Sequence, residues 1–316
     1  MSIQPADAAD AADAADAADA ADAAGITLTG LSTGVARPIG LSPELQRIIP
    51  ADPNSLWATA KWPPRNSSGW GQAKNNTYFP RQAWGPQYLA VAVLSEFVQA
   101  TVPASGSNPA YTWKDITLPA YPSSTAAVAA EIAELVQLTA FRSDVMAEAL
   151  AQRGGVLRYW GGLLMFNRAS HPRTWELGQI AIHVGEFQAM FHKYKFNRPR
   201  PSQLSNMLMP PIAVPGHASY PSGHATEAYL ISGLLNLVMP LNDPVPPPAS
   251  TPPTSLQRLA ERVARNREVL GLHYPSDSAA GKLLAEKTVP LLQQCKTVKL
   301  IITAATNEWT NTTAYP

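Results

Sequence analysis

Three short segments carry the residue types that a tetrahedral oxyanion site needs. They read KYKFNRPRP, YPSGHA and RNREVLGLHYPSD, and their polar residues are, in order, Lys193 and Arg200; Ser222, Gly223 and His224; and Arg267, His273 and Asp277. Fixed cations bind an anion, and the N–H groups at a helix start favour negative charge. Imidazoles transfer protons or act as nucleophiles. The chain therefore predicts a catalytic site built around a small oxyanion.

The first segment supplies two cations seven residues apart. Arg200 offers a planar, bidentate guanidinium, and Lys193 offers a mobile point charge. Arg198 competes with Arg200 for this role, but only Arg200 has Lys193 seven residues before it. Taken alone, Lys193 beside Lys195 suits a solvated position better than a site.

Arg267 falls on an apolar helix stripe, formed by Leu256, Leu259, Val263 and Leu270. We expect its side chain to face the core, where an unpaired guanidinium is costly and needs an anion or a carboxylate. An internal ion pair, or a stem that reaches the surface, would also satisfy it.

Ser222-Gly223 precedes an apolar run and predicts a helix start. The unpaired amides there point outward, and glycine lets an oxyanion approach the backbone closely. Simple N-capping by Ser222 is the alternative interpretation.

The two histidines have different expected roles. Asp277 follows His273 by four residues and can accept the Nδ1 proton, which leaves Nε2 as a nucleophile or a metal ligand. His224 suits proton transfer. We expect structural roles for the remaining buried or surface histidines, His171, His183 and His192.

The motifs K-x6-R-P, P-S-G-H and R-x5-H-x3-D, present in this order over residues 193–277, resemble the signature of the type 2 phosphatidic acid phosphatase and vanadium haloperoxidase superfamily. One position departs from that pattern: Asn266 stands where a serine usually precedes the arginine. Asparagine can still form hydrogen bonds. The resemblance says little about residues 1–150.

The resemblance implies an α-helical bundle with vanadate or phosphate in its core. It implies oxygen-binding roles for five residues, Lys193, Arg200, Ser222, Gly223 and Arg267. His273 would be the covalent partner of vanadium or phosphorus, and His224 the acid–base residue. The implied cofactor is vanadate, and phosphate can occupy the same site.

Two chemistries fit one such pocket. In a phosphatase, His273 attacks phosphorus to form a phosphohistidine, His224 protonates the leaving alcohol, and Asp277 orients His273. In a haloperoxidase, vanadate bound to His273 takes up hydrogen peroxide, Lys193 and the arginines polarise it, and a halide attacks to give hypohalous acid.

His217, seven residues before His224, favours the haloperoxidase. Its position resembles that of a second histidine in the bromide-oxidising enzymes, although a loop histidine without function is the plain alternative. The superfamily's lipid phosphatases are embedded in membranes, and its small secreted acid phosphatases carry signal peptides. We therefore expect a vanadium-dependent haloperoxidase acting on bromide or iodide. A soluble acid phosphatase acting on a phosphomonoester is second, and a non-catalytic oxyanion-binding scaffold is third.

The elements that position these residues are predicted to be helices. Apolar periodicity and capping residues predict seven helices. The first lies within 86–102, the second runs from a cap at Ser123, Ser124 or Thr125 to a break at 154–155, and the third covers 156–168. The others run from a Thr174 cap to 199–201, over 223–239, over 256–270 after Ser255, and over 277–294 after Ser276. The helix that begins at the Thr174 cap would carry a buried stripe of Ile180, Val184, Phe187 and Phe191. No strand series is present, so we expect an all-α bundle with the site in its core.

Four regions are expected along the chain. Residues 1–24 form a low-complexity Ala/Asp tail, 25–122 a Trp- and Pro-rich N-terminal cover, 123–300 the helical catalytic domain, and 301–316 a C-terminal tail. Seven prolines predict a non-helical crossover loop over 240–253.

Composition and net charge indicate a folded protein with a small anionic ligand. Apolar residues make up 46% and charged residues 15%, which indicates a folded globule. Net charge is +1, but six of the 23 acidic residues lie in the Ala/Asp tail. The 17 others face 24 basic residues, so the remainder carries +7, which suits a small anionic ligand.

Sequence signals for other partners and compartments are missing. Basic blocks for nucleic acid are absent, as are a secretory signal and a run long enough to span a bilayer. Cys295 is the only cysteine, which excludes an intrachain disulfide. We expect a soluble protein, cytoplasmic or exported without a recognisable signal. The resemblance adds the expectation of a homo-oligomer, a dimer or larger.

Overall fold

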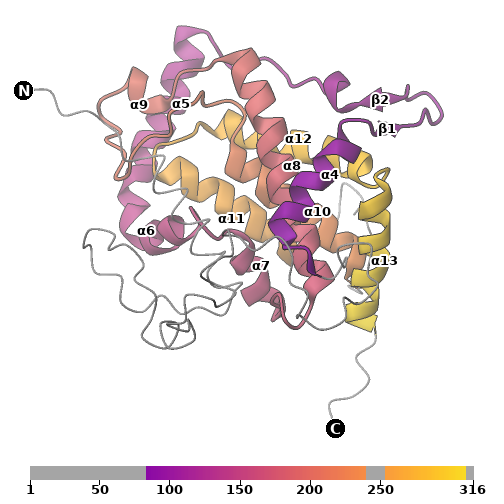
Figure 1. Ribbon diagram of the computed structural model, residues 1–316. Coiled ribbons are helices and arrows are strands. Elements are labelled where there is room, and N and C mark those ends of the chain that lie inside the picture. The colour runs from indigo at the N-terminus through magenta and orange to yellow at the C-terminus, as the bar shows by residue number, and fades with distance from the viewer. Residues whose placement is uncertain (1–82, 240–252, 311–316) are drawn as a thin grey trace, which may run out of the picture. The chain divides into compact units, whose positions relative to one another are not determined.

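The computed structural model describes residues 83–239 and 253–310, and these are mostly helical, which confirms the all-α class (Figure 1). The longer helices are α4 (Pro86–Phe97), α5 (Thr125–Leu138), α6 (Arg142–Ala151), α7 (Leu157–Leu164), α8 (Pro172–Phe196), α10 (Gly223–Val238), α11 (Ser255–Val269), α12 (Pro275–Leu292) and α13 (Lys296–Thr310). A single turn, α9 (Pro201–Leu204), follows α8, and the 3-10 turns are η2 (Trp113–Asp115) and η3 (Thr139–Phe141). Strands β1 (Thr101–Val102) and β2 (Tyr111–Thr112) form one antiparallel pair.

The core forms around α10, which packs against α8, α11 and α12. Leu230, Ile231, Leu234 and Leu235 of α10 are fully buried, as is Leu284 of α12. Burial of each such side chain contributes on the order of 1.5–3 kcal/mol. Packing against α8, α11 and α12 therefore fixes the position of α10, whose first residue is Gly223.

Helix α8 begins earlier than the sequence predicted. His171 is its N-cap and Pro172 occupies the first turn, where a missing N–H costs nothing. Thr174, the predicted cap, lies inside the helix, and its amide and hydroxyl both donate to Glu308 of α13. The predicted cap was wrong because Thr174 binds Glu308 of the distant helix α13 instead of capping α8.

The predicted buried stripe on α8 is correct only at its start. Ile180 and Val184 are fully buried, but Phe187 is half-buried and Phe191 is 37% exposed. The buried face continues instead through Gln188 and His192. Polar side chains thus face inward along the second half of α8, toward the end that carries Lys193.

The N-caps of two later helices lie one and two residues before the predicted ones. Thr254, rather than Ser255, caps α11 through a reciprocal bond pair with Gln257. Tyr274 is the N-cap of α12 and Pro275 its first residue, so Ser276 lies inside the first turn. In each case a capping box or a proline at the first position decided the boundary.

Other predicted boundaries need correction. The helix expected over 156–168 ends at Leu164, where Met165 adopts a left-handed conformation with φ 57°. The expected C-terminal tail is helical as far as Thr310 and packs on α8, so only 311–316 lie outside the described residues. Helix α4, assigned to the N-terminal cover, also packs on α8. The Ala/Asp tail, residues 25–82 of the cover and the crossover at 240–252 lie outside the described residues.

Within the described residues, none of the helices is both long and apolar enough to cross a membrane.

Gly281 of α12 lets that helix approach the start of α10. A Cβ atom there would lie 2.8 Å from the carbonyl oxygen of Ser222 and 2.9 Å from Cβ of Ala225. The backbone at Ser222 cannot move away without a large cost in free energy. The overpacking caused by a Cβ atom should therefore destabilise the protein by about 1–3 kcal/mol, more than the gain of about 1 kcal/mol from the higher helix propensity of alanine. We expect Gly281→Ala to lower the free energy of unfolding by about 1–2 kcal/mol in urea denaturation.

The matched control for this prediction is Gly162→Ala on α7. A Cβ atom at Gly162 meets nothing within 4 Å. Propensity alone should then stabilise the protein by about 0.5–1 kcal/mol. A Gly281→Ala protein as stable as the Gly162→Ala protein would contradict the close approach.

Candidate oxyanion site

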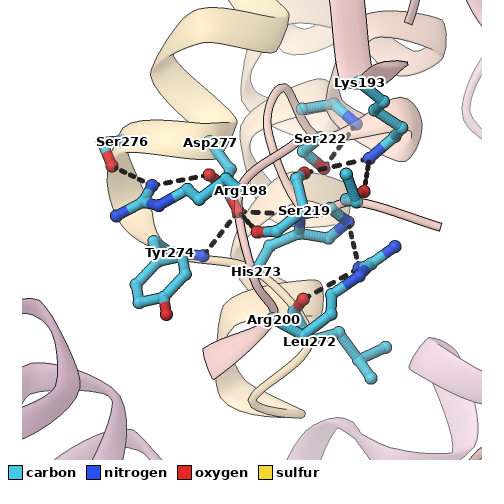
Figure 2. A network of polar contacts seen from close by, with 12 residues as sticks. Lys193, Arg198, Arg200, Ser219, Ser222, Leu272, His273, Tyr274, Ser276 and Asp277 are labelled. Atoms are coloured by element: carbon cyan, nitrogen blue, oxygen red, sulfur yellow. Dashed lines mark hydrogen bonds and ion pairs between the residues drawn. The ribbon is translucent and has the colours of Figure 1, made fainter. Parts of the chain in front are cut away.

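The three segments that the sequence singled out meet at one end of the helical body. Lys193 lies near the end of α8, and Arg200 is the N-cap residue of the α9 turn that follows. Ser222 is the N-cap of α10, and His273 lies in the connection between α11 and α12 (Figure 2). Segments separated by up to 80 residues of chain thus supply side chains to one buried cluster.

Asp277 organises the centre of this cluster. Its Oδ2 atom lies 3.1 Å from Nδ1 of His273 and accepts from the amide of Tyr274 at 3.0 Å. The same oxygen accepts from the hydroxyl of Ser219. A carboxylate that accepts from Nδ1 fixes the tautomer with the proton on Nδ1. Nε2 of His273 therefore keeps its lone pair.

Arg200 faces that lone pair. Its Nη1 atom lies 3.0 Å from Nε2 of His273 and donates to the carbonyl of Leu272 at 2.9 Å. Nη2 lies 3.0 Å from Nδ1 of His217, and Nε donates to the His217 carbonyl. Among the described residues Arg200 has no carboxylate partner within ion-pair distance, and burial lowers its pKa to about 10. Its charge is available to an anion.

Arg198 has a structural role instead, which settles the competition that the sequence left open. Its guanidinium donates to Asp277 and to Glu131, each at 2.7 Å. It also stacks on the ring of Tyr274, with 3.6 Å to the ring centroid. Two carboxylates already neutralise Arg198, so it has little charge left for a ligand.

Lys193 is 2% exposed, so the solvated alternative was wrong. Its Nζ atom donates to the carbonyl oxygens of Ala218 and Ser219 at 2.8 and 2.9 Å. Burial, reinforced by Arg200, lowers its pKa to about 7. A bound anion would restore the charged form, because opposite charge favours it.

Arg267 faces the core as predicted and is 1% exposed. Its Nη2 atom donates to the carbonyl of Ala149 and to Gln152 Oε1, but its Nε atom has no hydrogen-bond partner among the described residues. Asn266, the departure from the motif, donates to Glu148 and Gln152 and so supports the same corner. A buried guanidinium with an unused donor fits an oxyanion ligand.

The start of α10 has the capping geometry that was the plain alternative for Ser222. Its hydroxyl accepts from the amide of Ala225 at 3.3 Å, and its own amide donates to the carbonyl of Asp277 at 3.0 Å. Capping and anion binding do not exclude each other, because the first amides of a helix have no acceptor within the helix. Gly223 has no side chain to block their approach.

His224 lies in the first turn of α10, among all three cations. Burial lowers its pKa to about 3, with Arg267 the largest charged contributor and smaller effects from Lys193 and Arg200. Burial and the same cations, Arg200 first, also hold the pKa of His273 well below its usual range. Both imidazoles are therefore neutral at pH 7, and a bound anion would raise both pKa values.

His217 is exposed at the rim of a pocket of about 1010 Å³. Lys193 and Arg200 line the same pocket, together with Met190, Tyr194 and the 214–218 segment. His224, Arg267 and His273 do not line it. The pocket gives access to the site from the Arg200 side.

Sequence reasoning missed three residues of this region. Ser219 and Glu131 hold Asp277 and Arg198 in place, and no spacing rule links them to the motifs. Glu227 follows Gly223 by one helical turn, and that spacing could have identified it. Its carboxyl group interacts electrostatically with Lys193 and Arg267.

The three histidines expected to be structural form no hydrogen bond with the expected site residues in the described part of the chain. His171 stacks on Trp309, with ring centroids 4.2 Å apart, and Nδ1 of His183 lies 3.0 Å from the Gln179 carbonyl. His192 is buried, and neither ring nitrogen has a partner in the described part of the chain. Burial lowers its pKa to about 4, so it is neutral at pH 7.

Comparison with protein-family models and with curated proteins finds no match to this chain. Among residues 83–239 and 253–310, three or more His, Cys, Asp or Glu side chains never gather in a metal-binding cluster. The expected vanadium ligand is a single imidazole, that of His273, with hydrogen-bond donors around the oxygens. Such a site needs no ligand cluster.

Proposed function

We propose that this protein binds vanadate at His273 and uses hydrogen peroxide to oxidise bromide or iodide to hypohalous acid. One observation carries the proposal: Nδ1 of His273 is held by Asp277, and Nε2 is directed at Arg200 inside a group of buried cations. This is an imidazole prepared to bond the central atom of an oxyanion.

The donor set suits vanadate oxygens. Arg200 lacks a carboxylate partner in the described part of the chain, Arg267 has an unused Nε donor, and the amides at the start of α10 point out of the helix. When bound, vanadate supplies the activation of peroxide for attack by a halide. Nη1 of Arg200 would exchange its contact with His273 for an oxyanion oxygen.

The chain's own residues would handle protons and access. His224 is neutral at pH 7 and lies among the cations, so it can accept a proton there and return it to an oxygen. Lys193 donates to oxygens and balances their charge. His217, on the pocket rim beside Arg200, lies where a halide or its acceptor would enter.

A soluble acid phosphatase is the second candidate, favoured by the size of the pocket next to Arg200. There, Nε2 of His273 would attack phosphorus as the ester P–O bond breaks, and His224, protonated once the bound anion has raised its pKa, would give its proton to the leaving alcohol. Water would then cleave the phosphohistidine to release inorganic phosphate, and its proton would return to His224. Assembly into a dimer or larger oligomer stays a prediction.

One paired assay separates the two functions. We expect vanadate-loaded protein, given peroxide, bromide and monochlorodimedone, to consume monochlorodimedone, and vanadate-free protein not to. The same preparation without vanadate is given p-nitrophenyl phosphate. Phosphate release there, with no halide oxidation in the first assay, would replace the haloperoxidase by the phosphatase.

A further inference from the structure

Helix α10 brings one carboxyl group into the cationic site. Glu227 lies four residues after Gly223 and therefore on the same helix face. A Cβ atom placed on Gly223 would lie 3.8 Å from Oε1 of Glu227. The carboxyl group is thus next to the helix start that would bind the oxyanion.

Gly185 of α8 makes room for this side chain. A Cβ atom there would lie 3.1 Å from Cγ and 3.2 Å from Cα of Glu227. The glycine allows α8 and α10 to approach with the carboxyl group between them. Glu227 is half-buried, and the start of its side chain is held between the two helices.

The charges that act on Glu227 belong to α8 and α11. It interacts electrostatically with Lys193 and Glu186 of α8 and with Arg267 of α11. Neither cation forms an ion pair with it within 4.0 Å among the described residues. Burial, with a smaller effect from Glu186, raises its pKa to about 8 in spite of both cations. At neutral pH the group is a carboxylic acid.

The two forms of this group would have opposite effects on an anion. A carboxylate beside bound vanadate or phosphate would repel it, whereas a carboxylic acid has one O–H to donate. We propose that Glu227 is a further ligand of the oxyanion site, donating a hydrogen bond from its protonated carboxyl group to an oxygen of the bound anion. This inference rests on the oxyanion site of the proposed function.

The direction of the pH effect follows from the raised pKa. Glu227 keeps its proton below about pH 8 and loses it as the pH rises through that value. A bound anion stabilises the protonated form further, so the anion and the proton bind together. Anion affinity should fall above that pH by more than the titration of the anion and of Lys193 explains.

Calorimetric titration with orthovanadate, and separately with inorganic phosphate, tests this at about pH 6.5 and about pH 9. Glu227→Gln keeps a donor that does not titrate. We expect it to bind like the unmodified protein at the lower pH and about tenfold more tightly at the higher pH. Glu227→Leu removes the donor and should bind about tenfold more weakly than the unmodified protein at the lower pH.

Glu186→Gln is the matched control, since it removes a neighbouring negative charge but no ligand; it should retain the loss of affinity at high pH. Circular dichroism melts identify a variant that does not fold. Equal pH dependence in the unmodified and Glu227→Gln proteins would overturn the inference. This readout needs no catalysis: binding without halide oxidation or phosphatase activity would refute the proposed function and leave Glu227 standing. Absence of binding at both pH values would overturn both proposals.

Discussion

The His273→Ala protein should lose vanadate-dependent halide oxidation by more than about a hundredfold, the largest effect we expect from a single substitution on activity. His273 is the only imidazole in the described part of the chain whose Nδ1 is held by a buried carboxylate. Its Nε2 is directed at Arg200 at 3.0 Å. Alanine removes the one atom that could bond the central atom of the anion.

Two measurements check this expectation. Bromide-dependent loss of monochlorodimedone gives the activity, and dialysis followed by elemental analysis gives the vanadium that stays bound. His183→Ala is the control, because His183 lies on α8 with Nδ1 near the Gln179 carbonyl, away from the site. Full activity in the His273→Ala protein would refute the assignment of the covalent partner.

The Asp277→Ala protein should be less stable by about 3–5 kcal/mol, the largest stability effect we expect. Asp277 is fully buried and binds Arg198, His273, Ser219 and the amide of Tyr274 at once. Without this carboxylate, buried Arg198 keeps Glu131 as its one carboxylate partner in the described part of the chain and otherwise only the hydroxyl of Ser276 and the ring of Tyr274. Removing one partner of a buried ion pair destabilises the folded state by more than the pair itself stabilises it, because the other charge stays buried.

Urea denaturation followed by circular dichroism measures this change, with Asp144→Ala on the exposed surface of α6 as the control. Asp277→Asn keeps the side-chain volume but loses the charge, so the stability of this protein should fall between that of the Asp277→Ala protein and that of the Asp144→Ala protein. If Asp277→Ala unfolded at the same urea concentration as Asp144→Ala, the carboxylate could not be the centre of this network.

The His273 and Asp277 predictions use a pairing that the spacing of four residues indicated before the structure. The helix that begins at Pro275 made that spacing informative, because it fixes where Asp277 lies relative to the preceding loop. Lys193 was ambiguous by contrast, since a lysine near the end of a helix can lie in water or in the interior. Only the packing of the 218–219 carbonyl groups over Lys193 decided the matter.

The sequence by itself determined the helical class, the approximate extent of most helices and the three motif segments that meet in one buried cluster. These depend on apolar periodicity, on capping residues and on motif spacing, all of which act over a few residues of chain. Only the tertiary structure decided that Arg198 is neutralised by Glu131 and Asp277, that Thr174 binds Glu308 instead of capping α8, and that Glu227 interacts electrostatically with Lys193 and Arg267. Each of these contacts depends on desolvation and on partners more than 30 residues away in the chain. Neighbouring residues in the sequence indicate neither the burial nor the partner.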